Sequence, residues 1–250
     1  MPYFSYTQIQ LGPIILQIWG LFLGLGFLVG YLIVLRQAQK HNIEQKKIIW
    51  LVFFLFLASI LGARLAYVLQ YNIDLSKIFY IWEGGLTFYG GFLGALIVGW
   101  VYIKKTKLNF WQIADILVPV VALGIFLGRI GCSLINDHQG TIADLPWAIK
   151  WPDGTLRHPV AEYLALNGLI MFFVLYFLQK RLKRIGQLFI VFLIWYSLAR
   201  FFLDFIRVND PAYWGLTASQ WISLFILICV IILIWRKNGI VFQLRKLFKS

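Results

Sequence analysis

Charged residues at helical spacing within one apolar stretch indicate a site for an anion. Arg200, Asp204 and Arg207 follow one another at spacings of four and three residues, which would place them on one face of a helix. Asp204 can pair with either arginine. A guanidinium group offers a planar fork of N–H donors that suits the oxygens of a phosphate. The pattern therefore predicts a cationic pocket that binds a phosphate.

Membrane helices must position these residues. Of the 250 residues, 61% are hydrophobic and only 13% are charged, whereas an average soluble domain is about 45–50% apolar. This composition excludes a water-soluble globule, a disordered chain and a coiled coil. We expect an all-α, polytopic membrane protein in which residues 1–250 form a single domain. Seven stretches approach the roughly 20 apolar residues that a transmembrane helix needs: approximately 13–35, 48–68, 86–103, 113–131, 160–178, 187–206 and 216–235.

The distribution of charge predicts how these helices are oriented. Basic residues gather in alternate connections and in the C-terminal tail, and the positive-inside rule assigns those segments to the cytoplasm. The N-terminus is then outside and the C-terminus cytoplasmic. Topology accounts for most of the net charge of +13, so nucleic-acid binding loses its support and contact with anionic membrane lipid is favoured. The basic residues concerned are Arg36, Lys40, Lys46, Lys47, Lys104, Lys105, Lys107, Lys180, Arg181, Lys183, Arg184, Arg236, Lys237, Arg245, Lys246 and Lys249.

Arginines on three different helices are expected at a similar depth. With a rise of about 1.5 Å per residue, Arg64, Arg129 and Arg200 lie about 24, 24 and 20 Å from the cytoplasmic ends of their helices. An arginine at mid-membrane costs about 2.5–3.5 kcal/mol on insertion scales, so such residues pair, bind a ligand or lie toward an interface. The anion available near the outer surface is a phospholipid headgroup. For Arg64 and Arg207, simple snorkelling to the interface is an open alternative.

The longest external connection, approximately 132–159, carries further candidates. His138 follows Asp137, and a histidine oriented by a carboxylate can act as a general base near neutral pH. The alternative is a solvated loop pair. The segment 147–151 and the turn formers that follow it favour a short hairpin. We therefore expect a small structured cap outside the membrane.

Glycines and possible metal ligands complete the candidates. Gly90 and Gly91 begin the third apolar stretch. Small residues allow helices to pack closely, and they also let backbone donors approach a ligand, so both uses stay open. No cluster of histidine, cysteine and carboxylate residues has the spacing of metal ligands, so we expect no metal and no organic cofactor.

Several ordered motifs resemble the bacterial prolipoprotein diacylglyceryl transferase family, and the resemblance covers nearly the whole chain. The run Gly128-Arg129-Ile130-Gly131, followed by Asn136, Asp137 and Gly140, is similar to the family signature. The segment 82–91 is similar to the family element Gly-Gly-Leu-Ser-Phe-His-Gly-Gly. Other blocks resemble later family motifs in the same order: Arg157-His158-Pro159 with Tyr163, 200–207, and Gly215-Leu216-Thr217 with Gln220.

The resemblance implies a reaction at the extracytoplasmic side of the bacterial inner membrane. The family transfers the diacylglyceryl group of phosphatidylglycerol to the lipobox cysteine thiol of a prolipoprotein signal peptide, which forms a thioether and releases glycerol phosphate. Arg129 and Arg200 would stabilise the departing phosphate ester. The substrate-binding residues would include both arginines and Asp204, Arg207, Arg64, Asn136, Gly140, Gly90 and Gly91.

The sequence departs from the family at three positions. Tyr89 occupies the catalytic position where many members carry histidine, Trp19 stands where tyrosine is usual, and Cys132 stands where asparagine is usual. A thiol needs a base or an electropositive site to become a good nucleophile. A phenol titrates near pH 10 and is a poor base, so Asp137 and His138 are the alternative candidates.

Two other functions stay open beside the transferase. The departures at Tyr89 and Trp19 would suit a catalytically silent relative that binds anionic lipid or guides lipoprotein precursors. A transporter or channel would favour polar residues through both leaflets or broken helices at the midplane. The inner halves of the predicted helices are largely apolar, which disfavours this last class.

Overall fold

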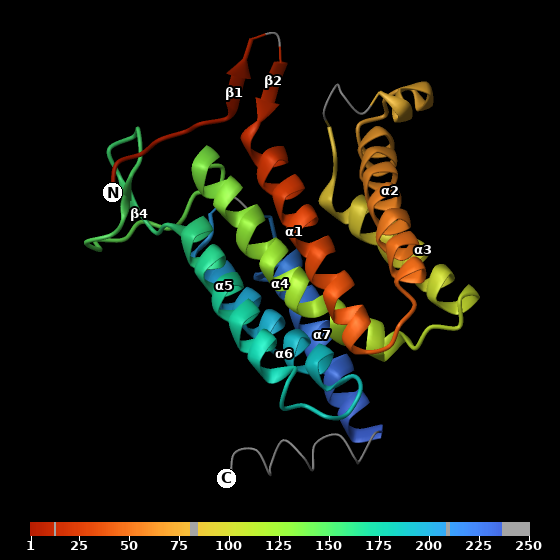
Figure 1. The fold of residues 1–250 in the computed structure, drawn as a ribbon. Coiled ribbons are helices and arrows are strands. Elements are labelled where there is room, and N and C mark those ends of the chain that lie inside the picture. The colour runs from red at the N-terminus through yellow and green to blue at the C-terminus, as the bar shows by residue number, and fades with distance from the viewer. Residues whose placement is uncertain (13, 81–84, 209–210, 237–250) are drawn as a thin grey trace. The chain divides into compact units, whose positions relative to one another are not determined.

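The computed structural model describes residues 1–12, 14–80, 85–208 and 211–236 (Figure 1). The chain divides into two compact units, one of Met1–Gly30 with Ala114–Ser250 and the other of Tyr31–Ile113.

The helices confirm the expected all-α class. Within the described part of the chain there are seven α-helices, and each predicted apolar stretch corresponds to one of them. Six are long and apolar enough to cross a membrane, and α3, with 18 residues ending in two lysines, is the exception. The protein is therefore a multi-pass membrane protein. The helices are α1 (Ile18–Lys40), α2 (Gln45–Gln70), α3 (Phe88–Lys105), α4 (Phe110–Ile135), α5 (Val160–Leu178), α6 (Gln187–Leu203) and α7 (Ala218–Arg236).

At two of the predicted helix ends the structure differs from the prediction for a local reason. The first helix begins at Ile18 rather than near residue 13, because β1 (Gln8–Leu11) and β2 (Ile14–Gln17) form an antiparallel hairpin. Gly12 turns this hairpin with a φ of 61°, a conformation that glycine adopts without strain. The fourth helix continues beyond residue 131 to Ile135, so its last turn includes four residues that we had assigned to the cap.

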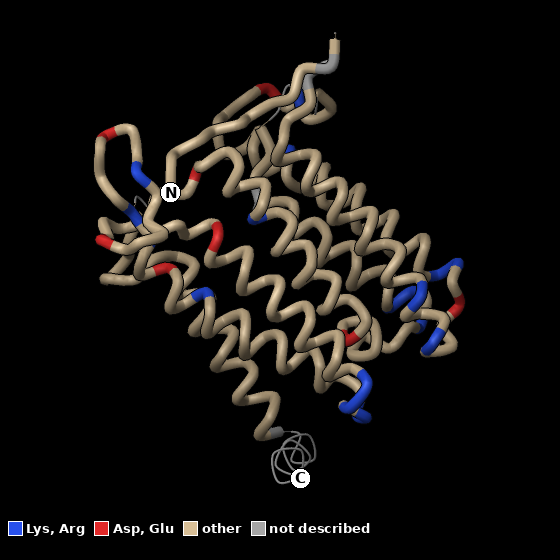
Figure 2. The backbone as a smooth tube through the Cα atoms, turned by 60° about the vertical axis from the view of Figure 1, so that its left-hand side comes forward, with Lys and Arg blue, Asp and Glu red and all other residues tan. Residues whose placement is uncertain are grey.

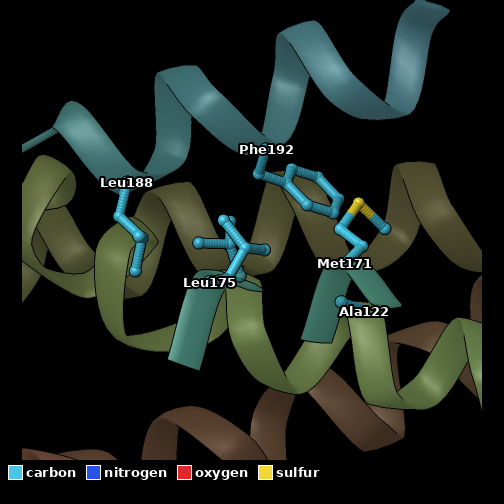
Figure 3. Close-up of a cluster of buried hydrophobic side chains, with 6 residues drawn as sticks. Ala122, Met171, Leu175, Leu188 and Phe192 are labelled. Atoms are coloured by element: carbon cyan, nitrogen blue, oxygen red, sulfur yellow. The ribbon is translucent and has the colours of Figure 1, made fainter. Parts of the chain in front are cut away.

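A cluster of buried side chains joins three helices of the first unit (Figure 3). Phe192 of α6 and Met171 of α5 lie over Ala122 of α4, and Ala122 and Met171 are fully buried. The α4, α5 and α6 residues of this cluster are Val118, Ala122, Met171, Leu175, Leu188 and Phe192. Packing of this kind sets the positions of the helices that carry the charged residues.

The outer surfaces of the helices are apolar. In the six candidate spans, between 17% and 39% of the most apolar window is buried inside the protein. Phe173 on α5 and Phe225 on α7 are examples of large exposed side chains. Such surfaces match the hydrocarbon core of a membrane.

Basic residues lie at one end of α5 and α6. The connection between these helices carries Lys180, Arg181, Lys183 and Arg184, at the end of α5 opposite the cap (Figure 2). In the other unit, lysine and arginine gather at the turn from α1 to α2 and at the end of α3.

Asp115 fixes the start of α6 to α4. Its Oδ2 accepts a hydrogen bond from the backbone N–H of Gly186 at 2.5 Å, and its Oδ1 accepts one from Phe189 at 2.8 Å. The first N–H groups of a helix have no partner within the helix, so an acceptor from another helix stabilises them. Asp115 therefore links the helix that carries Arg129 to the helix that carries Arg200.

We predict that Asp115→Ala lowers the free energy of unfolding by about 1–2 kcal/mol, the usual worth of a helix cap. Asp115→Asn keeps one acceptor oxygen and should lose less. Thermal unfolding in detergent, followed by circular dichroism, measures both. A melting temperature of the alanine variant equal to that of the wild type would refute the link.

Candidate functional site

Asp204 is the centre of a buried polar cluster, and its side chain has no solvent exposure. Its Oδ1 lies 3.1 Å from Nη2 of Arg200 and 3.2 Å from Nη1 of Arg207. Its Oδ2 accepts hydrogen bonds from Ser219 Oγ, at 2.6 Å, and from Thr217 Oγ1. The pairing of Asp204 with both arginines, predicted from their spacing, is confirmed. Asp204 ends α6 and begins the short 3-10 helix η3 (Asp204–Ile206).

The start of α7 holds the two hydroxyl groups in place. Thr217 and Gln220 form a capping box: the Thr217 N–H donates to Gln220 Oε1 at 2.9 Å, and the Gln220 N–H donates to Thr217 Oγ1 at 3.2 Å. Gln220 Nε2 also donates to the Phe201 carbonyl on α6 at 3.2 Å. This arrangement aligns the start of α7 with the end of α6, where Asp204 lies.

Arg200 has one nitrogen without a partner. Its Nη2 donates to Ser219 Oγ at 3.1 Å as well as pairing with Asp204. Its Nη1 is buried and makes no hydrogen bond to any described residue. Arg129 and Arg207 both lie close enough to act on Arg200 electrostatically. A buried donor that lacks a partner is costly, and two further arginines in electrostatic range make the place suit an anion with several oxygens.

Arg129 contacts the Asp137–His138 pair. Its Nη1 lies 2.7 Å from Nε2 of His138. Arginine can only donate, so Nε2 is the acceptor and the ring proton is on Nδ1. That Nδ1 lies 2.5 Å from Asp137 Oδ1, although the contact is not aligned as a hydrogen bond, so the carboxylate acts on the ring through its charge. The His138 side chain is 18% exposed and the Asp137 side chain 42%, so the alternative of a solvated loop pair suits Asp137 better than His138.

Trp19 and Cys132, two of the positions at which the sequence departs from the family, lie next to each other in the structure. The indole of Trp19 interacts with the thiol of Cys132, which is buried and also lies beside Arg129. Gly131 makes the close approach possible, because a Cβ there would lie 3.3 Å from the Cα of Trp19. In this chain the two positions form one contact, in which an N–H group interacts with a sulfur atom.

The fold also brings together three potential metal ligands that the sequence spacing did not reveal. Ligand atoms of Cys132, Asp137 and His138 lie within 4.8 Å of one another. They come together because α4 ends at Ile135 and the chain turns back at Asn136. The guanidinium group of Arg129 lies against two of the three, and this positive charge disfavours a metal cation at the same place.

Asn136 ends α4 and anchors the N-terminal segment. It is buried and has a φ of 53°, a left-handed conformation that asparagine tolerates better than most residues. Its Nδ2 donates to the Phe4 carbonyl at 2.9 Å. The N-terminal segment then continues along the cap, where the Lys150 N–H donates to the Met1 carbonyl at 3.0 Å.

The cap connects α4 to the arginine cluster. Its predicted hairpin is confirmed, because β3 (Ile149–Lys150) pairs antiparallel with β4 (Leu156–Arg157). The segment around Gly140 forms a bridge with Arg207. On its other side, the His158 N–H donates to the Thr141 carbonyl at 3.0 Å. The loop that carries Asp137 and His138 is thereby held beside the end of α6.

Gly140 is required by close packing. A Cβ at this position would lie 2.3 Å from the backbone oxygen of His158 and 2.9 Å from its Cβ. We predict that Gly140→Ala destabilises the protein by about 1–3 kcal/mol, as overpacking does, and lowers activity because the cap shifts. Gly24→Ala is the control, since a Cβ there meets nothing within 4 Å. Equal melting temperatures for the two variants would contradict this account.

Within Tyr31–Ile113, Arg64 is tied to the backbone. It is buried, its Nε donates to the Lys77 carbonyl at 3.1 Å, and its Nη1 donates to the Gly85 carbonyl at 3.3 Å. Its guanidinium group also lies 5.6 Å from the ring centroid of Tyr67. Arg64 therefore supports the connection between α2 and α3. Simple snorkelling does not describe it.

The remaining candidates lie at the start of α3. Gly90 and Gly91 pack against α2, where a Cβ on Gly90 would lie 2.3 Å from that of Ala66 and one on Gly91 would lie 3.0 Å from the Ser59 oxygen. Close helix packing thus accounts for these glycines. The side chain of Tyr89 is exposed. The part of the family motif at 82–84 lies outside the described residues, as does the basic tail at 237–250.

Together, the fold and the cluster define a multi-pass membrane protein with a candidate anion-binding site at one end of α4 and α6. A model of the prolipoprotein diacylglyceryl transferase family matches residues 7–236. The chain belongs to this family.

Curated relatives agree over most of their length. A protein of Chromohalobacter salexigens is 35% identical over 228 residues, which cover 87% of this chain and 84% of the relative. A protein of Pasteurella multocida is 35% identical over 237 residues, covering 89% and 87%. One of Idiomarina loihiensis is 33% identical over 258 residues, covering 94% and 97%. All three are named phosphatidylglycerol–prolipoprotein diacylglyceryl transferases.

Proposed function

We propose that the protein transfers the diacylglyceryl group of phosphatidylglycerol to the lipobox cysteine of prolipoproteins in lipoprotein maturation. Membership of the family and the names of its relatives support the reaction and both substrates. The observation that carries the proposal for this chain is the buried, unpartnered Nη1 of Arg200 beside Arg129 and Arg207. A phosphate diester supplies the oxygens that such a nitrogen requires.

The reaction makes a specific demand on these residues. The thiolate sulfur attacks a glycerol carbon of the lipid, a C–S bond forms, and the bond from that carbon to the phosphate-ester oxygen breaks. Negative charge then grows on the departing glycerol phosphate. Guanidinium groups at that oxygen stabilise the transition state more than the ground state. We assign this role to Arg129 and Arg200, with Asp204 orienting Arg200 and Arg207 adding positive charge.

The thiol proton needs an acceptor. Asp137 and His138 are the favoured pair, since His138 contacts the same arginine that would hold the phosphate. Tyr89 is the other catalytic candidate. Asn136 and Gly140 would shape the cap over the substrates. Arg64, Gly90 and Gly91 are the proposed substrate-binding residues of the other unit.

The proposed location is the bacterial inner membrane, with seven spans, the N-terminus and the cap outside, and the active site toward the extracytoplasmic side. The alternation of basic connections supports this orientation. The pairing of Met1 with Lys150 also supports it, because it keeps the N-terminus and the cap on one side.

The test is a transfer assay with purified protein, phosphatidylglycerol and a lipobox peptide, read by mass spectrometry. We expect a thioether-linked diacylglyceryl peptide and free glycerol phosphate. A peptide with serine in place of the lipobox cysteine should give no product. If the wild-type protein is folded and binds phosphatidylglycerol but forms no thioether, the protein is a catalytically silent relative, which the Trp19–Cys132 exchange would then explain.

A further inference from the structure

The contact between Arg129 and His138 has a consequence for the order of events. Nε2 is the only ring nitrogen of His138 with a free lone pair, because Nδ1 carries the proton. Nη1 of Arg129 donates a hydrogen bond to that lone pair, with 2.7 Å between Nη1 and Nε2. While this contact lasts, His138 cannot accept a proton from a thiol.

We propose that Arg129 masks His138 until a lipid phosphate draws the guanidinium group away, so that the thiol is activated only after phosphatidylglycerol has bound. This inference rests on the proposed function and concerns the same site. It assigns Arg129 two successive partners, first the imidazole and then the phosphate.

The strengths of the two contacts favour the exchange. The phosphate carries a negative charge and the His138 imidazole is a neutral acceptor, so the guanidinium group is attracted more strongly to the phosphate. Arg200 gives the phosphate its first anchor through the unpartnered Nη1. Arg129 lies close enough to interact electrostatically with Arg200, so a phosphate on Arg200 competes with His138 for the donors of Arg129.

Once Arg129 has left it, the imidazole of His138 can act as a base, because Asp137 stabilises its protonated form. When Nε2 takes the thiol proton, the ring becomes a cation, and the Asp137 carboxylate 2.5 Å from Nδ1 stabilises that charge. The sulfur forms its bond to the glycerol carbon, and the electron pair of the broken C–O bond stays on the phosphate. The proton then passes from Nε2 to the glycerol phosphate that leaves. Arg129 and the Cys132 thiol, both on α4, also lie close to His138.

Two substitutions at His138 separate masking from proton transfer. His138→Ala removes both the base and the competitor for Arg129. We expect it to lower the rate of transfer about 10²–10⁴-fold, the usual effect of losing a general base. It should also bind phosphatidylglycerol about three- to tenfold more tightly than the wild type, because one hydrogen bond no longer competes.

His138→Gln keeps an acceptor for Arg129 but cannot take a proton. We expect it to bind phosphatidylglycerol with the affinity of the wild type and to transfer as poorly as the alanine variant. His41→Ala is the matched control, since His41 is exposed in the turn between α1 and α2, and it should leave both quantities unchanged. Affinity is measured by titrating phosphatidylglycerol into protein held in phosphatidylcholine nanodiscs, and circular dichroism checks the fold.

The outcomes distinguish this inference from the proposed function. If the wild type transfers the lipid but His138→Ala binds it no more tightly, or if either variant transfers at the rate of the wild type, masking is refuted and the transferase stands. If the alanine variant does not fold, His138→Gln still tests the inference. Masking is refuted if this variant binds phosphatidylglycerol more weakly than the wild type or transfers at the rate of the wild type. If the folded wild type neither binds phosphatidylglycerol in preference to phosphatidylcholine nor forms a thioether, both proposals fall.

Discussion

Arg200→Ala should lower kcat/KM for diacylglyceryl transfer by about 10³-fold, the upper range for removing one donor from a developing oxyanion. The substitution removes Nη1, which has no hydrogen-bond partner among the described residues, and also the pairing of Nη2 with Asp204 and Ser219. Arg200→Lys keeps a positive charge but loses the planar fork, so we expect it to recover only part of the rate. Transfer to a lipobox peptide at several lipid concentrations separates kcat from KM.

The matched control for this loss is Arg36→Ala. Arg36 is an exposed residue in the last part of α1, and its removal should change kcat/KM by less than about twofold, as is usual for a surface charge. The account would be contradicted if Arg200→Ala kept the activity of this control while its melting temperature matched that of the wild type.

Asp204→Ala should produce the largest loss of stability. The carboxylate is fully buried and receives two hydroxyl hydrogen bonds and two guanidinium contacts. Its removal leaves two mostly buried arginines without their counter-ion, and breaking a buried pair in this way costs about 3–5 kcal/mol. Asp204→Asn keeps an acceptor for the hydroxyl groups but loses the charge, so an intermediate loss is expected. Thermal unfolding in detergent measures both.

Asp153→Ala provides the comparison, because Asp153 is an exposed carboxylate of the cap that also pairs with an arginine, Arg157. Hydrogen bonds from Thr155 lower the pKa of Asp153, so it is charged at neutral pH. Its removal should change the melting temperature little, since exposed pairs contribute little. If Asp204→Ala melts as high as Asp153→Ala, Asp204 is not the centre of the cluster.

The helices and the pairing of Asp204 with both arginines could be predicted because each depends on residues that are close together in the sequence. Long apolar stretches define helices, and spacings of four and three residues place Arg200 and Arg207 around Asp204. The cap hairpin could be predicted for the same reason, from its turn residues. Where one apolar run serves both a strand and a helix, as at 14–35, composition does not mark the boundary.

Contacts between distant segments could not be predicted. Thr217 and Ser219 reach Asp204 from the start of α7, and the spacing of residues on α6 gives no information about this contact. The meeting of Arg129 with His138 depends on the turn at Asn136. The separation of nine residues between Arg129 and His138 in the sequence does not indicate that their side chains meet.

The most direct test is a structure of the protein in nanodiscs with a phosphatidylglycerol analogue whose scissile ester oxygen is replaced by CH₂, so that it binds without reacting. The account predicts one phosphorus group with its oxygens about 3 Å from nitrogens of both Arg129 and Arg200, and His138 Nε2 free of Arg129. A headgroup bound elsewhere, with Arg129 still on His138 and Arg200 Nη1 still without a partner, would contradict it.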